Sequence, residues 1–424
     1  MKNRYMMAAT ITFLIVAGLS SAASAAPPYP YPGLFEEVTG IVEAHFYNPV
    51  QIHEDFPAIK ETCRRQVPQI ATREAFAALV NTMLGKLNAS HTYYLTPSDY
   101  EYYHLAALFS KIPEIGALFP EQTVRYPTVG IQTRTFGEQV HIVSVLAGSI
   151  AEKAGLLKGD EILSVNGNPF EPIASLRPFV GADVTFNIRR QEHAAPFNAV
   201  MKPVLANPKQ EMLDAQKASV RIIEQSGKRI GYIHIYSYAG DEYHQALIHA
   251  LVWGKLKNAD ALIIDLRYGL GGAWPYYLNI FNRDIPVLEM IDREGKKTTV
   301  DSQWRKPAVY LVNAFSRSGK ELLAFGAKKY QTATVIGERT PGQTLGGRLF
   351  PLSNKDMLFL AVQESRIDGV NLEGIGVAPD IEVPFDIRYC SGQDVQLEKA
   401  VEHLVHQLSV ERAAAHRISP SYRP

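Results

Sequence analysis

Apolar positions recur with a helical period in the first quarter of the chain. Between Thr72 and Leu87 the sequence contains no proline, and its hydrophobic residues stand three or four positions apart. This spacing predicts an amphipathic helix within a helical N-terminal region, residues 26–125, and its apolar face should pack against the rest of the protein. That face carries Ala75, Phe76, Leu79, Val80, Met83, Leu84 and Leu87.

The pattern changes to short β-rich runs after residue 125. Gly and Asn turn signals separate the runs 140–145, 161–165 and 184–188. Short strands between such turns predict a separate small β domain over residues 126–204.

Strand-like and helical runs alternate after a proline-containing linker at residues 203–208. This alternation predicts an α/β core over residues 205–390. A last amphipathic helix, about residues 395–408, falls in the C-terminal segment 391–424. The strand-like runs of the core are 230–235, 261–266, 308–312, 334–336 and 357–362, and the helical ones are 243–256 and 320–330.

The first 25 residues have the pattern of a secretory signal peptide. Lys2 and Arg4 precede an apolar stretch from about residue 6 to 19, and the small residues Ala23-Ser24-Ala25 follow. An uncleaved anchor is the alternative, but the stretch is shorter than the roughly 18 residues of a spanning helix. We therefore predict removal of residues 1–25 and a periplasmic or secreted protein with no integral membrane segment after cleavage.

The charge balance and the number of cysteines limit which partners and cofactors we expect. The 43 basic residues equal the 43 acidic ones without a long run of either sign, so nucleic acid is not an expected partner. Cys63 and Cys390 are the only cysteines, and they form no CxxC or Cys-His cluster. We therefore expect no metal and no organic cofactor. An oxidising compartment would permit the two thiols to pair, and the sequence leaves that pairing open.

Residues 144–167, SVLAGSIAEKAGLLKGDEILSVNG, carry turn signals at several fixed offsets. Gly155 closes a short helix, Gly159-Asp160 forms a turn, and a strand leads into the hairpin signal Asn166-Gly167. The segment resembles the core motif of PDZ domains, "GSxAxxAGLxxGDxIlxVNG".

The resemblance to PDZ domains implies peptide binding. Such domains add an extended peptide as a strand and hold its terminal carboxylate on loop amides. By resemblance the loop is 126–131, with Val129, Gly130 and Ile131 as its binding residues. A β domain that only packs or gates is the alternative, because Pro127 removes one amide from this loop.

A strand that ends in a polar turn and opens a helix lies at residues 309–321. Such a turn can expose a nucleophile, because the first amides of the helix are free to hold an anion. A serine here is equally an ordinary helix N-cap. The segment resembles the motif "N-x-x-S-x-S-x-x-E" of the carboxy-terminal processing proteases, which implies Ser318 as the nucleophile and Ser316 as its neighbour.

Three further segments are similar to motifs of that family of serine peptidases. They are ALIIDLRYGLGG at 261–272, VIGERTPGQ at 335–343 and GIGVAPDIEV at 374–383. Together with the PDZ segment, the resemblance extends over most of the mature chain. It implies an α/β protease core (a mixed sheet with helices) plus the N-terminal helical region and a small all-β PDZ domain.

One position departs from the family pattern. The general-base lysine of the Ser-Lys branch falls at position 343, where this chain has Gln343, and an amide cannot take a proton from serine. The tricorn-type branch uses Ser-His-Glu chemistry, with its histidine in an "SHxY" motif before the PDZ domain. That resemblance implies His91 as the base, Ser90 as a helper hydroxyl and Glu373 as a member of the charge network. Taken singly, each also fits an ordinary surface or turn residue.

The oxyanion of acyl transfer needs two donors. The amide of Gly319, directly after the nucleophile, is the first prediction. The turn Gly271-Gly272 supplies the second, with Gly271 preferred, because glycine lets the backbone approach a ligand closely.

The sequence therefore predicts an exported serine endopeptidase that cleaves proteins or peptides through an acyl-enzyme. A peptide-binding pseudoprotease is one alternative, which Gln343 and the unusual Arg317 and Lys320 favour. A hydrophobic-ligand binder is another, because the fold also occurs in a retinoid-binding protein of the eye and the run 274–277 is aromatic. Whether the chain forms a homo-oligomer stays open.

Overall fold

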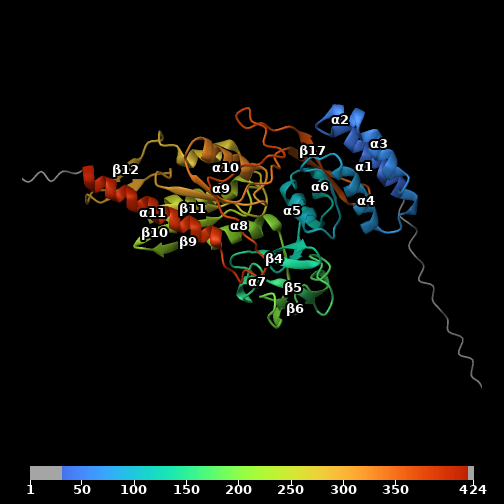
Figure 1. Cartoon of the computed structure of the whole chain (residues 1–424), viewed down its shortest axis with the longest axis horizontal. Coiled ribbons are helices and arrows are strands. Elements are labelled where there is room, and N and C mark those ends of the chain that lie inside the picture. Colours follow the sequence, from blue (N-terminus) through green and yellow to red (C-terminus); the bar gives the residue numbers. More distant parts are fainter. Residues whose placement is uncertain (1–30, 419–424) are drawn as a thin grey trace, which may run out of the picture.

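The computed structural model describes residues 31–418, so the predicted signal peptide lies outside the described residues. Figure 1 shows an elongated molecule with the N-terminal helices at one end and the C-terminal helix at the other. The small β domain projects from the middle, between these two parts. The fold is a mixed α/β core with a helical N-terminal region and an all-β domain, as the sequence predicts.

The core is built on a six-stranded sheet with strand order β18-β15-β14-β11-β10-β9. Its strands are parallel except for β9, which pairs antiparallel with β10 at one edge. The bounds are β9 (Arg221–Gln225), β10 (Lys228–His234), β11 (Ala261–Asp265), β14 (Ala308–Val312), β15 (Thr334–Gly337) and β18 (Ile381–Glu382).

Alternation along the strands explains why helices cover both faces of this sheet. Successive strand side chains point to opposite faces, so Ile263 of β11 packs in one cluster with Leu404 of helix α11 (Val395–Ile418). Ile264 packs on the other side with Leu247 and Leu323. That side is covered by α8 (Pro208–Ser219), α9 (Asp241–Val252) and α10 (Gly319–Lys329).

The small β domain is a five-stranded antiparallel sheet in the order β3-β4-β5-β6-β7. A short pair, β2 (Tyr126–Thr128) with β8 (Val204–Ala206), joins the points where the chain enters and leaves it. Strand β3 lies at the edge of the sheet and leaves one side open to a further strand. The bounds are β3 (Ile131–Phe136), β4 (Gln139–Val145), β5 (Glu161–Val165), β6 (Val184–Arg189) and β7 (Phe197–Met201).

The N-terminal region contains a strand as well as helices. Strand β1 (Tyr93–Leu95) pairs with β17 (Met357–Gln363), which pairs with β16 (Gly346–Pro351). This pairing brings the segment after His91 against strands from the C-terminal part of the core. The helices are α1 (Tyr31–His45), α2 (Pro49–Glu54), α3 (Phe56–Arg64), α4 (Arg73–Gly85), α5 (Tyr100–Leu108) and α6 (Pro113–Gly116).

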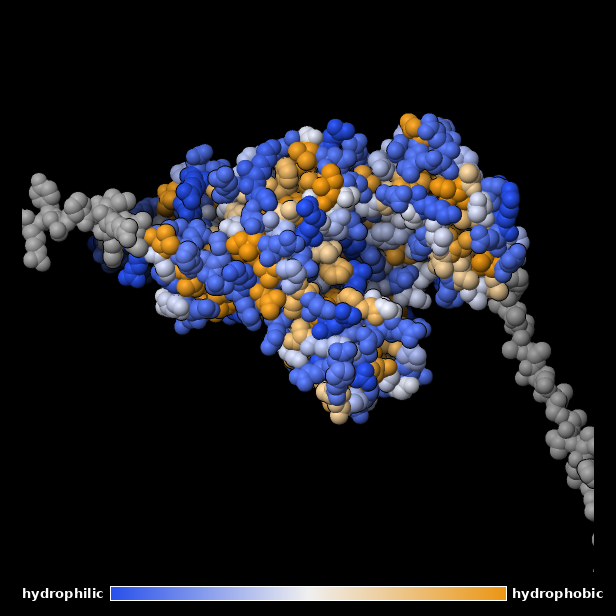
Figure 2. Space-filling model, viewed as in Figure 1, coloured by the Kyte–Doolittle hydropathy of each residue, from blue (hydrophilic) through white to orange (hydrophobic). Residues whose placement is uncertain are grey.

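Both cysteines are free thiols. Cys63 is buried among the N-terminal helices, whereas the Cys390 thiol lies against the Lys158 carbonyl of the β domain. Across residues 31–418, no helix has the length and apolar character needed to span a bilayer. Figure 2 shows a largely hydrophilic face on which hydrophobic side chains gather only in small groups.

Candidate active site

The candidate nucleophile stands at the junction of β14 and α10. Ser318 is the N-cap of α10, and its φ of 59° with ψ of −131° lies where residues with a Cβ are strained. Its amide donates to the Gln343 carbonyl at 2.9 Å and to a carboxylate oxygen of Glu321 at 3.1 Å. The main chain at Ser318 is therefore held by one backbone carbonyl and one side-chain carboxylate.

Glu321 is the residue that ties this turn to the following segment. Its buried carboxylate accepts hydrogen bonds from the Thr340 hydroxyl at 2.6 Å and from the amides of Gly342 and Gln343, each at 2.7 Å. Burial raises the pKa of Glu321 despite these donors. Position 343 thus lies beside the nucleophile, although its amide side chain cannot act as a base.

The glycine turn Gly271-Gly272 lies against the nucleophile. A Cβ added to Gly271 would stand 2.5 Å from the Cβ of Ser318 and 2.9 Å from its Oγ, whereas one on Gly272 would meet the Tyr238 carbonyl. Among the described residues, none accepts a hydrogen bond from the amide of Gly271 or Gly272. Gly271 is therefore the nearer of the two predicted donors to Ser318.

The candidate base is the first member of a chain of three residues. The Ser90 hydroxyl lies 2.9 Å from His91 Nδ1 and donates to Glu373 Oε2 at 3.0 Å. Glu373 also accepts from the amides of Ser90 at 2.9 Å and Thr344 at 2.8 Å. The structure thus brings together the residues that the resemblance singled out, and Glu373 joins the base to the segment that follows Gln343.

The surroundings of His91 favour its neutral form. Burial, with a further contribution from the nearby Arg317 guanidinium, lowers the pKa of His91 to about 4, and Glu101 acts in the opposite direction. The ring is therefore uncharged at neutral pH and has a free acceptor nitrogen.

His91, Ser318, Gly271 and Gly319 line one cavity of about 330 Å³. No hydrogen bond joins the His91 ring to the Ser318 hydroxyl in this structure. A catalytic contact between them therefore requires a rearrangement, and in many enzymes such hydrogen bonds tighten only when substrate binds. Apolar side chains form much of the wall, among them Leu105, Phe109 and Phe359.

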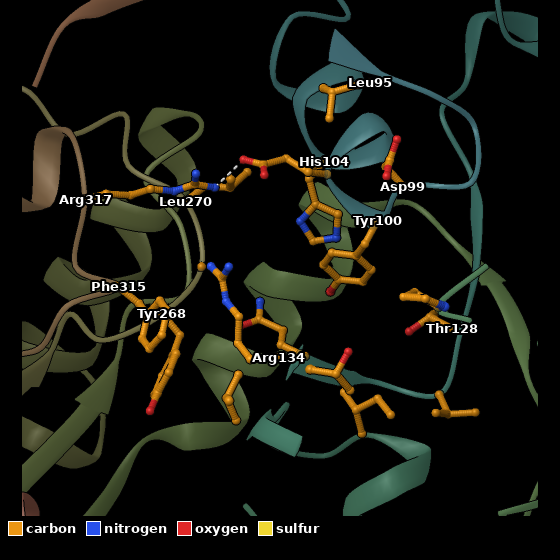
Figure 3. A pocket seen from close by; sticks show the side chains of 18 of the residues that line it. Leu95, Asp99, Tyr100, His104, Thr128, Arg134, Tyr268, Leu270, Phe315 and Arg317 are labelled. Atoms are coloured by element: carbon orange, nitrogen blue, oxygen red, sulfur yellow. Dashed lines mark hydrogen bonds and ion pairs between the residues drawn. The ribbon is translucent and has the colours of Figure 1, made fainter. Parts of the chain in front are cut away.

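A second cavity of about 470 Å³ lies between the β domain and the core (Figure 3). It is lined by Thr128, Val129 and Ile131 from the predicted peptide-binding loop, and it shares Arg317 with the first cavity. The Gly130 amide donates to the Thr128 hydroxyl at 2.8 Å, so that amide is occupied in this structure.

Sequence reasoning noted Arg317 and Lys320 beside Ser318 as unusual but assigned neither of them a role in the active site. Arg317 forms an ion pair with Glu101 of α5 at 2.5 Å. The Lys320 ammonium is fully buried and donates to the carbonyls of Tyr236 and Tyr268, and burial lowers its pKa to about 7. The family motif has small residues at both positions. The presence of two cations there was the feature of the sequence that could have indicated a charged wall beside Ser318.

A strained serine, an imidazole backed by a hydroxyl and a carboxylate, and free amides across one cavity define a serine hydrolase site. Comparisons with known proteins make the class specific. Residues 229–383 match the model of peptidase family S41, residues 141–190 match a PDZ domain, and residues 27–85 match the tricorn protease C1 domain. The protein is a serine-type peptidase, and these matches to peptidase family S41, the PDZ domain and the tricorn protease C1 domain confirm the resemblance found in the sequence.

Curated relatives match over most of the chain. A carboxyl-terminal-processing protease of Synechocystis sp. is 26% identical over 365 residues, which are 80% of this chain and 79% of that protein. Carboxyl-terminal-processing peptidase 3, chloroplastic, of Arabidopsis thaliana is 22% identical over 82% of this chain and 67% of its own.

The tricorn branch is represented as well. Tricorn protease homolog 1 of Streptomyces coelicolor is 24% identical over 87% of this chain and 34% of its own. The crystal structure of the tricorn protease aligns with a TM-score of 0.54 at 18% identity, over 89% of this chain and 37% of that one. The chain thus spans about a third of these tricorn proteins, and the structural likeness supports the fold.

Proposed function

We propose that this protein is an exported serine endopeptidase that cleaves proteins or peptides through an acyl-enzyme on Ser318, with His91 as its general base. The observation that carries the proposal is the hydrogen-bonded series His91, Ser90 and Glu373. Its imidazole lines the same cavity as Ser318. Gly319 and Gly271 are the proposed oxyanion donors, and the closer approach of Gly271 to Ser318 supports its choice over Gly272, whose amide is equally free among the described residues.

The proposed reaction needs only Ser318, His91, the oxyanion donors, the substrate and water. Ser318 Oγ forms a bond to the scissile carbonyl carbon while its proton passes to His91 Nε2, and the carbonyl oxygen becomes an oxyanion facing the amides. The tetrahedral intermediate collapses as the carbon–nitrogen bond breaks and His91 gives the proton to the leaving amine. Water then repeats the sequence and releases Ser318.

Glu373 and Ser90 orient the base in this proposal. The Ser90 hydroxyl keeps Nδ1 of His91 hydrogen-bonded and so leaves Nε2 toward the cavity, while the Glu373 carboxylate favours the imidazolium that forms during attack. This arrangement replaces the lysine that Gln343 cannot supply.

The PDZ domain is proposed to recruit or gate the substrate. Its predicted loop lines the 470 Å³ cavity, and the wall at Arg317 is common to that cavity and the catalytic one. Deletion of residues 126–204 should therefore slow cleavage of an unfolded protein, and an unchanged rate would remove this part of the proposal. Export is tested separately by N-terminal sequencing of the protein from culture fluid or periplasm, where the mature chain should begin at Ala26.

Labelling with a fluorophosphonate tests the chemistry. The wild-type protein should become labelled, Ser318→Ala and His91→Ala should not, and Gln343→Ala should retain labelling because the base is His91. Absence of wild-type labelling from pH 5 to 9, with peptide binding intact, would favour the pseudoprotease alternative.

A further inference from the structure

The carboxylate of Glu101 lies between the base and the nucleophile. It accepts a hydrogen bond from the Tyr93 hydroxyl at 2.7 Å and forms the ion pair with Arg317 at 2.5 Å. Tyr93 begins β1, two residues after His91, and Arg317 directly precedes Ser318. One side chain on α5 therefore contacts both of the chain segments that carry the proposed catalytic pair. Figure 3 shows the Arg317 guanidinium reaching across the second cavity, with a dashed line at its ion pair.

The pair is partly shielded from water, and the two charges stabilise each other. The side chains of Arg317 and Glu101 are 21% and 30% exposed, and both line the catalytic cavity. Burial alone would raise the pKa of Glu101, but Arg317 and the Tyr93 hydroxyl outweigh it and lower that pKa. Burial also works against the Arg317 charge, and Glu101 raises its pKa above the usual value. Partial desolvation strengthens such a pair compared with one on the surface.

No other charged pair in the described chain makes this connection. The His91 ring and the Ser318 hydroxyl share no hydrogen bond, and Glu373 contacts the base side and the segment after Gln343 but not the nucleophile turn. The contacts of Glu101 with Arg317 and with Tyr93 thus form the side-chain link between the nucleophile turn and the base-carrying segment.

We propose that Glu101 and Arg317 are positioning residues of the peptidase reaction, which tie the turn that carries Ser318 to the segment that carries His91 and set the charge around the base. This inference rests on the proposed function and extends it to a pair that none of the family motifs contains. Reactions of this type are sensitive to placement, because a shift of about 1 Å can lower the rate about 100-fold.

The charges of Glu101 and Arg317 should affect the pH dependence of activity, which a purely structural role of the pair would leave unchanged. The titratable groups that face His91 are Glu373 through Ser90, Tyr93 of β1, Glu101 of α5 and Arg317 of the nucleophile turn. Of these, Arg317 lowers the pKa of His91 and Glu101 raises it. Removal of the positive charge should therefore move the acid limb of the activity profile to higher pH, and removal of the negative charge should move it to lower pH.

The test measures the pH dependence of fluorophosphonate labelling, together with kcat and KM on a peptide substrate, for four variants of the full-length mature protein. Arg317→Gln and Glu101→Gln should each lower kcat about 10-fold to 100-fold with little change in KM, and their acid limbs should move in opposite directions. Arg317→Lys keeps the charge and should restore the position of the limb. Arg64→Gln breaks an exposed ion pair with Glu36 and is the control that should change nothing.

Acid limbs that move in the same direction in both Gln variants, or an unchanged kcat in both, would overturn the inference. Labelling of the wild-type protein would still uphold the proposed function in that case. Wild-type protein that never becomes labelled would overturn both. If Glu101→Gln fails to fold, Arg317→Gln against Arg317→Lys still decides, because the inference requires a displaced acid limb in the first and not in the second.

Discussion

The two halves of the candidate site are held in different ways. The nucleophile turn sits at the end of a buried central strand, and its main chain is fixed by the Gln343 carbonyl and the Glu321 carboxylate. The base-carrying segment follows helix α4 and leads into a three-stranded sheet; Glu373 links it to the segment after Gln343, and Glu101 links it to Arg317. The proposed nucleophile is therefore positioned by the fold of the core, and the proposed base is linked to the rest of the site by a few carboxylate contacts.

This difference predicts that carboxylates on the base side serve the reaction and that the carboxylate on the nucleophile side serves stability. Glu373→Gln removes the charge that favours the imidazolium and keeps an oxygen acceptor for the amides of Thr344 and Leu345, while its NH₂ replaces the oxygen that faces the Ser90 amide. Glu373 is half-buried, so water can solvate that NH₂ and the cost is smaller than at the buried Glu321. We expect kcat to fall about 1,000-fold, within the range for impaired general-base catalysis, with a change in unfolding free energy below about 1 kcal/mol. Steady-state kinetics and urea denaturation on the same preparation check this, and a loss of stability with kcat retained would reverse the assignment.

Glu321→Gln should have the opposite profile. The carboxylate is buried and accepts from three amides and a hydroxyl, so an amide NH₂ in its place leaves buried donors facing each other. A cost of about 3 kcal/mol in unfolding free energy is expected. Denaturation midpoints provide the measurement, and Glu138→Gln on the exposed hairpin of the β domain is the matched control. A variant as stable as wild type would show that the turn does not depend on Glu321.

Gly271→Ala probes the contact between Gly271 and Ser318. The new Cβ would stand 2.5 Å from that of Ser318, so the turn or the serine has to shift. We expect kcat to fall about 30-fold to 100-fold, since misplacing an oxyanion donor approaches the effect of removing one. Gly33→Ala, where nothing lies within 4 Å of the added Cβ, should behave as wild type. Equal kinetics for both variants would exclude Gly271 as a donor.

The smallest expected effect is on the pH dependence of stability. Burial lowers the pKa of His104 to about 3, so between pH 6.5 and that value the unfolded chain binds a proton that the folded one does not. Stability therefore falls as pH decreases through this window, and the contribution of one such group is about 1.4 kcal/mol per pH unit. His104→Phe should make the slope of unfolding free energy between pH 6 and 5 shallower by about that amount. An unchanged slope would mean that His104 does not remain neutral in the folded protein.

The strand runs that local patterns singled out form strands close to their predicted bounds. The run 308–312 forms β14 and the run 161–165 forms β5, because strand alternation and turn residues act over a few neighbouring positions. The C-terminal helix extends to Ile418, beyond the predicted end near residue 408. Strand β1 was not predicted at all, because a three-residue strand depends on pairing with β17 rather than on its own sequence.

The sequence by itself determined the classes of element, the position of Ser318 in a turn between strand and helix, and, through resemblance, the grouping of His91, Ser90 and Glu373. Only the tertiary structure decided how these residues meet and that Glu101 pairs with Arg317, whose positions lie far apart along the chain. The physical reason is that periodic patterns report which face of an element is buried, whereas an ion pair between two elements depends on how those elements pack.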